Sequence, residues 1–318
     1  MKDNSANLSQ TIRYRSGSGY DHNHFQYVPL KERPNIIWPN GSKIAWCVYL
    51  FLEYLELDPP EGSIRDPRYG GALGSHFPDY LNYSVREHGN RIGFWRILDI
   101  LDKYNIKPTV PVNAMLADRY PRMVQECIDR GWEIAGHGIS ATQMITSDIS
   151  LPKEKETIAK SLETLQKIYG KKVKGWFGQD YSQSTSTFKL LSEFGIEYVA
   201  DFPNDDSPYA TNYNGLLCIP NQSEWDDTQL MAVRRLMPWR WRDVVCEAFD
   251  YLYNEAHPSG TVMTLSIHPW LLGQAHRIKY LDEALKKMTL YKEVWQTNAL
   301  EVAAHYRNSS SKQSVNND

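Results

Sequence analysis

Three side chains that commonly transfer protons in enzymes follow short apolar runs of this 318-residue chain. Glu53 follows IAWCVYLFL, His137 lies between two glycines in EIAGHG, and His268 follows TVMTLSI. A carboxylate and two imidazoles that converge on one place supply a general base, a proton donor and a group that positions water. Each histidine alone could be a hydrogen-bonded core residue, so the prediction of a hydrolase site depends on their convergence.

Polar and aromatic residues near the same runs are candidate contacts for a substrate. Arg86 and Arg91 lie in an Arg-rich segment, and a guanidinium can bind a carboxylate or imide oxygen with two hydrogen bonds. The alternative is that they pair with neighbouring acids such as Glu87. Aromatic side chains are typical walls for a small flat ring, although they are also common in cores. The further candidates for substrate binding are Trp176, Gln179, Asp180, Asp205 and Trp270.

The apolar runs alternate with segments of helical spacing, which predicts a parallel sheet with crossover helices. The predicted strands are 43–55, 108–113, 132–138, 173–178, 197–202, 216–221, 261–269 and 293–298. The predicted helices are 93–106, 119–131, 151–170, 185–195, 239–256, 277–288 and 299–307. No GxGxxG motif follows the first strand and no GxxxxGK[ST] motif occurs, so a closed or nearly closed (β/α) barrel is favoured over a dinucleotide-binding sheet. In a barrel, the functional side chains lie at the carboxyl ends of the strands.

Composition predicts one catalytic (β/α) barrel domain over residues 36–308. Residues 1–35 are polar and are expected to form an N-terminal arm on the surface or on a neighbouring subunit, and 309–318 a disordered tail. The net charge is -3 and the pI about 6.3, so neither nucleic acid nor an anionic membrane is an expected partner. Without an apolar signal segment or a run long enough to span a bilayer, a cytoplasmic protein is expected.

The order of short motifs resembles the polysaccharide deacetylase superfamily (carbohydrate esterase family 4). These motifs are LFLEY around Glu53, GHG at 136–138, GWFG at 175–178, DFPNDDSPY at 201–209 and SIHPWLLGQAHR at 266–277. Two segments, RPNIIWPNGSKIA at 33–45 and NYSVREHGNRIGFWRILDIL at 82–101, are similar to the branch that holds cyclic imide hydrolases and metal-independent allantoinases. The resemblance covers about residues 30–307 and implies a distorted (β/α) barrel of the polysaccharide-deacetylase type.

The resemblance also implies that the usual metal site of the superfamily is incomplete. Deacetylases of this superfamily carry a TFDD-like motif, in which the first Asp is the base and the second binds metal, and an HxxxH motif with two further ligands. Glu53 falls on the base position, Tyr54 on the metal-binding Asp, His137 on the first His and Ala141 on the second. Neither a phenol nor an alanine methyl is a usual zinc ligand. We therefore expect no cofactor, and a single zinc or manganese ion held by other ligands is the alternative.

These observations predict a hydrolase that opens a small cyclic amide, such as an imide, ureide or hydantoin-like ring, at a C–N bond. Glu53 is the expected base, while His137 and His268 position the water, protonate the leaving nitrogen or stabilise the oxyanion. The other assignment, with His268 as the base, stays open. The expected partner is the small-molecule substrate, and the relatives imply a homo-oligomer, a tetramer. The alternatives are a metal-dependent N-deacetylase of an amino sugar or polysaccharide, and a catalytically inactive relative that binds a ligand.

Overall fold

The computed structural model describes residues 22–61, 63, 78–255 and 257–315, and every strand and helix predicted from the sequence is present. The strands are β1 (Ile44–Leu50), β2 (Thr109–Val112), β3 (Glu133–Gly136), β4 (Gly175–Trp176), β5 (Tyr198–Val199), β6 (Tyr209–Ala210), β7 (Leu217–Cys218), β8 (Val262–Ile267) and β9 (Val294–Thr297). The helices are α2 (Tyr80–His88), α3 (Phe94–Lys103), α4 (Ala114–Arg119), α5 (Pro121–Asp129), α6 (Leu151–Tyr169), α7 (Thr187–Glu193), α8 (Pro238–Glu255), α9 (Pro269–Leu272), α10 (Ile278–Met288) and α11 (Ala299–Val315).

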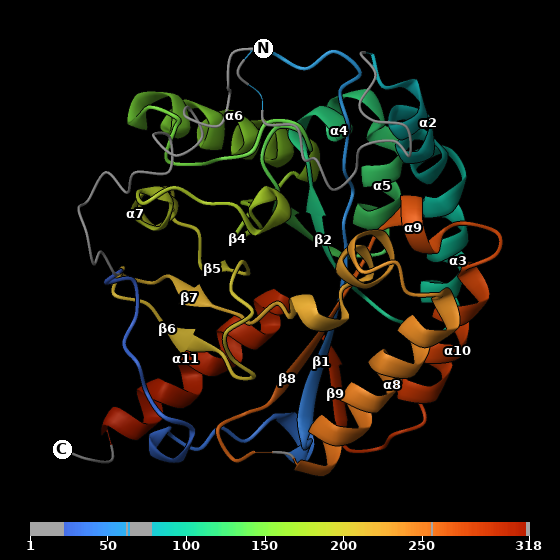
Figure 1. Cartoon of the computed structure of the whole chain (residues 1–318). Helices are drawn as coiled ribbons and strands as arrows, with labels where there is room; N and C mark the ends of the chain where they lie inside the picture. Colours follow the sequence, from blue (N-terminus) through green and yellow to red (C-terminus); the bar gives the residue numbers. More distant parts are fainter. Residues whose placement is uncertain (1–21, 62, 64–77, 256, 316–318) are drawn as a thin grey trace, which may run out of the picture.

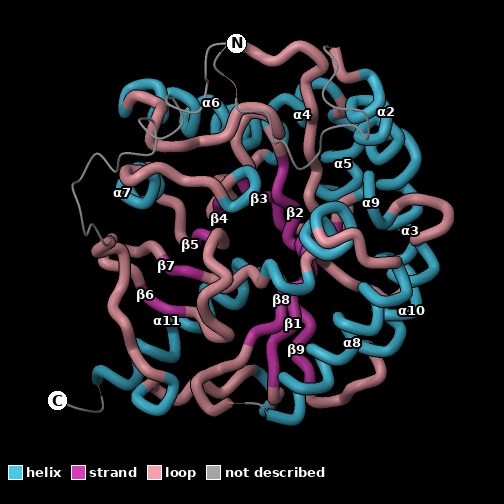
Figure 2. The backbone as a smooth tube through the Cα atoms, in the orientation of Figure 1, coloured by secondary structure: helices cyan, strands magenta, loops and turns pink. Residues whose placement is uncertain are grey.

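The strands form one curled sheet in the order β6-β7-β5-β4-β3-β2-β1-β8, and β9 pairs with β1 (Figures 1 and 2). All pairs are parallel except β6 with β7. The sheet curls into a half-barrel, which confirms the predicted distorted barrel. Because the strands are parallel, their carboxyl ends lie along one rim.

Strand β1 is buried on both of its faces because both are apolar. All seven of its residues are buried. Ile44, Trp46, Val48 and Leu50 pack into a cluster with α3, α5, α6, α8 and α10, whereas the alternate residues pack on the inner face of the sheet with α11. Successive side chains of a strand point to opposite faces, so the inner series continues through Phe51 to Glu53. The period of two therefore directs Glu53 into the half-barrel.

Three helices, α2, α4 and α9, were not predicted, and α2 covers part of the rim. No helix was predicted around Arg86, but α2 begins at Tyr80 and continues through the π-helical turn η4 (Gly89–Gly93) into α3. The glycines of this turn lie against α9. A Cβ atom on Gly89 would lie 2.6 Å from the backbone nitrogen of Trp270, and one on Gly93 would lie 2.2 Å from the carbonyl oxygen of Pro269. The close approach explains why two residues that disfavour helices occur inside this one.

The two ends of the chain differ from the sequence expectation. In the predicted arm, His24 is buried and its ring stacks on Phe188 with centroids 4.6 Å apart, so this part of the arm packs on its own domain. Residues 1–21 lie outside the described residues. The disordered tail predicted from residue 309 is wrong as far as Val315, because α11 continues to that residue. A helix that packing has already nucleated extends through polar residues at little cost.

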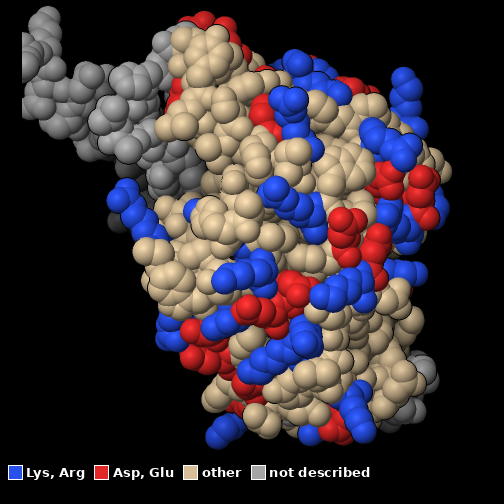
Figure 3. Space-filling model, turned by 90° about the vertical axis from the view of Figure 1, so that its right-hand side faces the viewer, with Lys and Arg blue, Asp and Glu red and all other residues tan. Residues whose placement is uncertain are grey.

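The surface formed by α2, α3, α8 and α10 carries charges of both signs (Figure 3). Several are paired between helices, such as Lys103 with Asp282 and Arg242 with Glu283. The four cysteines are buried free thiols. In the described part of the chain, no helix combines the length and the apolar character that crossing a bilayer requires.

Candidate active site

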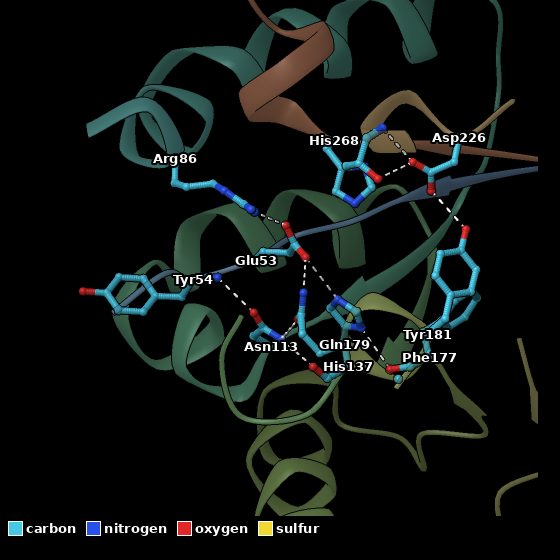
Figure 4. Close-up of polar contacts among 12 residues, drawn as sticks. Glu53, Tyr54, Arg86, Asn113, His137, Phe177, Gln179, Tyr181, Asp226 and His268 are labelled. Atoms are coloured by element: carbon cyan, nitrogen blue, oxygen red, sulfur yellow. Dashed lines mark hydrogen bonds and ion pairs between the residues drawn. The ribbon is translucent and has the colours of Figure 1, made fainter. Parts of the chain in front are cut away.

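A pocket lies at the carboxyl ends of β1, β3, β4 and β8, and it is lined by all three predicted catalytic residues (Figure 4). Glu53 is 8% exposed, His137 1% and His268 5%. These side chains come from positions far apart in the sequence, and the parallel sheet brings them together. The convergence on which the prediction of a hydrolase site depended is therefore present in the fold.

Both carboxylate oxygens of Glu53 accept hydrogen bonds. Arg86 Nη1 donates to Oε2 at 2.5 Å, and Gln179 Nε2 donates to Oε1 at 2.5 Å. His137 Nε2 lies 3.5 Å from the same Oε1. Burial alone would raise the pKa of Glu53, but the positive charge of Arg86, together with His137 and His268, holds it well below the usual value. Glu53 is therefore a carboxylate throughout the neutral pH range.

The orientation of Gln179 is set by Asn113, a fully buried residue that follows β2. Asn113 Oδ1 accepts the backbone N–H of Tyr54 at 3.0 Å, so its amide nitrogen must point the other way. That nitrogen donates to the backbone carbonyl of His137 and, at 3.2 Å, to Gln179 Oε1. The amide nitrogen of Gln179 must then face Glu53. Sequence reasoning missed Asn113, because its role comes from contacts with three other segments.

His137 is held in one orientation by its backbone neighbours. Its Nδ1–H donates to the carbonyl oxygen of Phe177 at 2.9 Å, which directs Nε2 toward Glu53. The flanking glycines fit the tight packing of this strand end. A Cβ atom on Gly136 would lie 2.7 Å from the ring of Trp176, and Gly138 has a φ of +70°, which favours glycine.

His268 forms a dyad with Asp227. Its Nδ1–H donates to Asp227 Oδ1 at 2.6 Å, and its backbone N–H donates to Oδ2 at 2.8 Å. Burial alone would lower the pKa of His268, but the charge of Asp227 and this hydrogen bond raise it to about 9. The ring also stacks on Phe51, with centroids 4.7 Å apart and planes 10° apart. The remaining ring nitrogen, Nε2, is the one available to a substrate.

Asp227 was also missed by sequence reasoning. The only sequence signal is the pair of acids in EWDDT after the strand around Leu217, and such pairs are common in turns. Burial raises the pKa of Asp227 to about 6, against the lowering effect of His268. The short contact and the histidine pKa of about 9 support an ion pair at neutral pH.

Residues 87–199 match the family model described as polysaccharide deacetylase. This segment of the chain therefore carries a polysaccharide deacetylase domain. A putative polysaccharide deacetylase of Schizosaccharomyces pombe is 25% identical over 294 residues, which cover 84% of this chain and 91% of that protein. The family that this domain matches is hydrolytic and acts on C–N bonds.

Two solved structures share the fold over most of both chains. A probable polysaccharide deacetylase from Pseudomonas aeruginosa PAO1 has a TM-score of 0.75 and 24% identity, over 86% of this chain and 94% of that chain. The PuuE allantoinase has a TM-score of 0.77 and 23% identity, over 92% of this chain and 98% of that chain. The half-barrel of the polysaccharide deacetylase type is therefore shared with proteins of more than one description.

The residues at the usual metal position of polysaccharide deacetylases do not fit a metal ion here. The Tyr54 ring extends away from the Glu53 carboxylate (Figure 4) and packs toward Tyr120, with centroids 6.1 Å apart. Ala141 presents only a methyl group to the pocket. The guanidinium of Arg86, 2.5 Å from Glu53, would repel a second cation at that carboxylate.

A second group of possible ligands, Asp226, Asp227 and His268, has atoms within 4.8 Å of one another. Their atoms are already engaged by the protein. Asp226 accepts from the hydroxyl groups of Tyr181 and Thr228, and Asp227 accepts from His268. We therefore derive no catalytic step through a metal ion.

The structure brings three of the predicted substrate contacts to the pocket and leaves four outside its wall. Arg86, Gln179 and Asp180 line the pocket, as does Phe177. Two of the four residues that do not line the pocket are tryptophans. Trp176 faces the outer helices, since it alternates with Phe177 along the chain, and Trp270 lies behind Arg86, whose guanidinium carbon is 4.0 Å from its ring centroid.

The other two corrections concern charged residues. Arg91 is exposed on the π-helical turn, whereas Arg86 is buried. The two side chains therefore lie on different faces of this helical segment. Asp205 accepts from Arg33 at 2.5 Å and from the backbone N–H groups of Asp206 and Ser207. It therefore caps a turn outside the pocket, in agreement with the local preference of Asp for turns.

Proposed function

We propose that this chain hydrolyses the C–N bond of a small cyclic amide, such as an imide, ureide or hydantoin-like ring, with Glu53 and His268 as the reacting groups. The observation that carries the proposal is the pairing of opposite charges in one pocket. A carboxylate with a lowered pKa and an imidazole with a pKa of about 9 both line it, each held by its own partner. A site in which a base and an acid are both in their reactive protonation states suits hydrolysis.

Glu53 is the proposed base. A water molecule beside Glu53 Oε1 and His137 Nε2, which are 3.5 Å apart, would donate one hydrogen bond to each. As the water oxygen bonds to the ring carbonyl carbon, one water proton passes to Glu53. The carbonyl oxygen of Phe177 accepts the ring proton of His137, which is on Nδ1, and this keeps the unprotonated Nε2 directed at that water.

His268 is the proposed acid. Because its Nδ1–H is held by Asp227, the proton that it can transfer is on Nε2. That proton passes to the ring nitrogen as the C–N bond breaks, and the proton on Glu53 then restores His268 through solvent. The products are a carboxylic acid and an amide or urea nitrogen on one open chain, so atoms and charge balance. The raised pKa of His268 supports the role of acid rather than of base.

The low basicity of Glu53 supports an activated carbonyl as the substrate. A zinc-bound water has a pKa of about 7, whereas bulk water has one of about 15.7. Without a complete ligand set, this site lacks the means of acidifying water on which metal-dependent deacetylases rely. Imide and ureide carbonyls are more electrophilic than the acetamide of an amino sugar, so a weaker base is sufficient to activate the attacking water. The fold shared with an allantoinase also supports this reading.

The second candidate function is metal-dependent N-deacetylation of an amino sugar or polysaccharide. The family model and the S. pombe relative favour it, since both are described as polysaccharide deacetylases. It requires ligands other than Tyr54 and Ala141 at the metal position.

The experiment that separates these functions measures hydrolysis on one purified sample before and after exhaustive chelation. The ring substrates are succinimide, maleimide, hydantoin, dihydrouracil and allantoin, and the acetylated substrate is a chitin oligomer. Ring opening that survives chelation supports the proposal. Deacetylation that is lost on chelation and restored by zinc or manganese would overturn it. The Glu53→Gln variant should lose ring opening, and Glu163→Gln, at an exposed position of α6, is the matched control.

A further inference from the structure

The outer part of the pocket is lined by apolar side chains from two loops. Leu55, Leu57 and Pro59 belong to the segment after β1, and Ala141 and Met144 belong to the segment after β3. Leu55, Leu57, Pro59 and Met144 are partly exposed. We call Leu55, Leu57, Pro59, Ala141 and Met144 together the apolar wall. The catalytic groups are buried at the strand ends, whereas the apolar wall is mostly part-exposed and lies toward the mouth of the pocket, with polar residues such as Asp79 and Asn82 also lining it.

The apolar wall is held together by one carboxylate. Glu56 Oε2 accepts from Ser140 Oγ at 2.6 Å, from Thr142 Oγ1 at 2.5 Å and from Gln143 Nε2 at 2.9 Å. The backbone adds a further bond, from the N–H of Ala141 to the carbonyl oxygen of Tyr54 at 2.8 Å. The two loops are thus joined beside the catalytic groups. A surface fixed in this way requires little ordering when it binds a ligand.

A ring amide with no substituent would not use the apolar wall. Its hydrogen-bonding groups would be satisfied at Glu53, His137 and His268. A hydrocarbon group on a ring carbon would extend beyond the reacting C–N bond and could cover the wall. A charged group in the same place would lose its hydration against apolar side chains, and a carboxylate would also be repelled by Glu56.

We propose that the substrate is a cyclic amide with an uncharged hydrocarbon substituent on a ring carbon, and that the apolar wall binds this substituent. The inference rests on the proposed function and specifies its substrate class. Each buried methylene group is expected to raise kcat/KM about fourfold.

The test compares hydantoin with its 5-methyl, 5-propyl and 5-carboxymethyl derivatives on the wild-type protein. The propyl derivative should be hydrolysed with a kcat/KM at least about tenfold above that of hydantoin, and the carboxymethyl derivative below it. The Met144→Gln variant should reduce the ratio of propyl to unsubstituted kcat/KM several-fold. The Met237→Gln variant, at an exposed position outside the pocket, should leave this ratio unchanged. Equal kcat/KM values for all four rings, or an unchanged ratio in Met144→Gln, would overturn the inference and leave the proposed function intact.

Binding separates failure of this inference from failure of the proposed function. Calorimetry measures the dissociation constants of hydantoin and 5-propylhydantoin. The wild-type protein is used if it does not open these rings, and the Glu53→Gln variant is used if it does. If no ring is opened but the propyl derivative binds at least tenfold more tightly, the proposed reaction is wrong and the apolar wall still selects the ligand. If the two rings bind equally, the inference is wrong whatever the outcome of the activity assay.

Discussion

Gln179 donates its amide N–H to Glu53 Oε1 at 2.5 Å, and Asn113 determines that the nitrogen of this amide, rather than its oxygen, faces the carboxylate. The chain of donors starts at the backbone N–H of Tyr54, the residue next to Glu53 itself. A carboxylate that is proposed to act as a base is thus held at Oε1 by groups that carry no charge and at Oε2 by the guanidinium of Arg86.

Replacing Gln179 with Met should raise the pKa of Glu53. The methionine side chain is similar in length but cannot donate, and a hydrogen bond to a charged group contributes about 1.5–3 kcal/mol. The acidic limb of the kcat/KM profile should therefore move to higher pH by about one unit or more. The measurement is the pH dependence of ring opening. The Gln125→Met variant, on the exposed side of α5, is the control. An equal loss of activity at every pH would mean that Gln179 has only a structural role.

Replacing Glu53 with Gln should reduce kcat by about a thousandfold, because the proton acceptor for the attacking water is lost. The variant should fold, but with a free energy of unfolding lower by about 3 kcal/mol, since the buried guanidinium of Arg86 loses its charged partner. Steady-state kinetics and urea denaturation measure the two effects. Activity close to that of the wild type would refute the assignment of the base.

Replacing Asp227 with Asn should move the alkaline limb of activity to lower pH. The proposed acid, His268, must be protonated, so wild-type activity should fall as the pH rises through about 9. Without the charge of Asp227, burial is opposed only by the weaker effects of Glu53 and Asp226, so the pKa of His268 should fall. The kcat/KM profile of the variant should therefore decline at a lower pH than that of the wild type. An alkaline limb that stays near pH 9 would show that another group is the acid.

Glu133 should make the protein less stable as the pH rises from about 5 to 7. Burial raises its pKa to about 7, despite hydrogen bonds from Tyr198, Thr109 and the backbone N–H of Leu300. The folded pKa exceeds the unfolded value, so the stabilisation is complete below the unfolded pKa and is lost as the pH rises through the folded one. The total is about 3 kcal/mol.

The measurement for Glu133 is urea denaturation at pH 5 and pH 8. The Glu133→Gln variant removes the titrating group, so its free energy of unfolding should fall less than that of the wild type between these two values. Glu163→Gln, at an exposed position, should keep the wild-type difference. If both variants behave alike, Glu133 does not titrate in this range.

Much of the fold could be predicted because the strands of a half-barrel have distinctive sequences. A buried parallel strand has a continuous apolar sequence, as in β1, and the shorter strands except β6 also lie within apolar stretches. The boundaries were predicted less well, since the sheet pairs only the central residues of 173–178 and 197–202, as β4 and β5. Helix α2 was missed because its sequence is polar and its packing depends on a close contact with α9.

The sequence by itself determined that Glu53, His137 and His268 meet, because parallel strands place their carboxyl ends on one rim. Only the tertiary structure decided which residues hold them. Asn113 and Gln179 are 66 positions apart, and Asp227 and His268 are 41 apart. No local pattern links such pairs. A side-chain hydrogen bond requires its two atoms to be placed to within a few tenths of an ångström, and only the packed core brings these distant segments together.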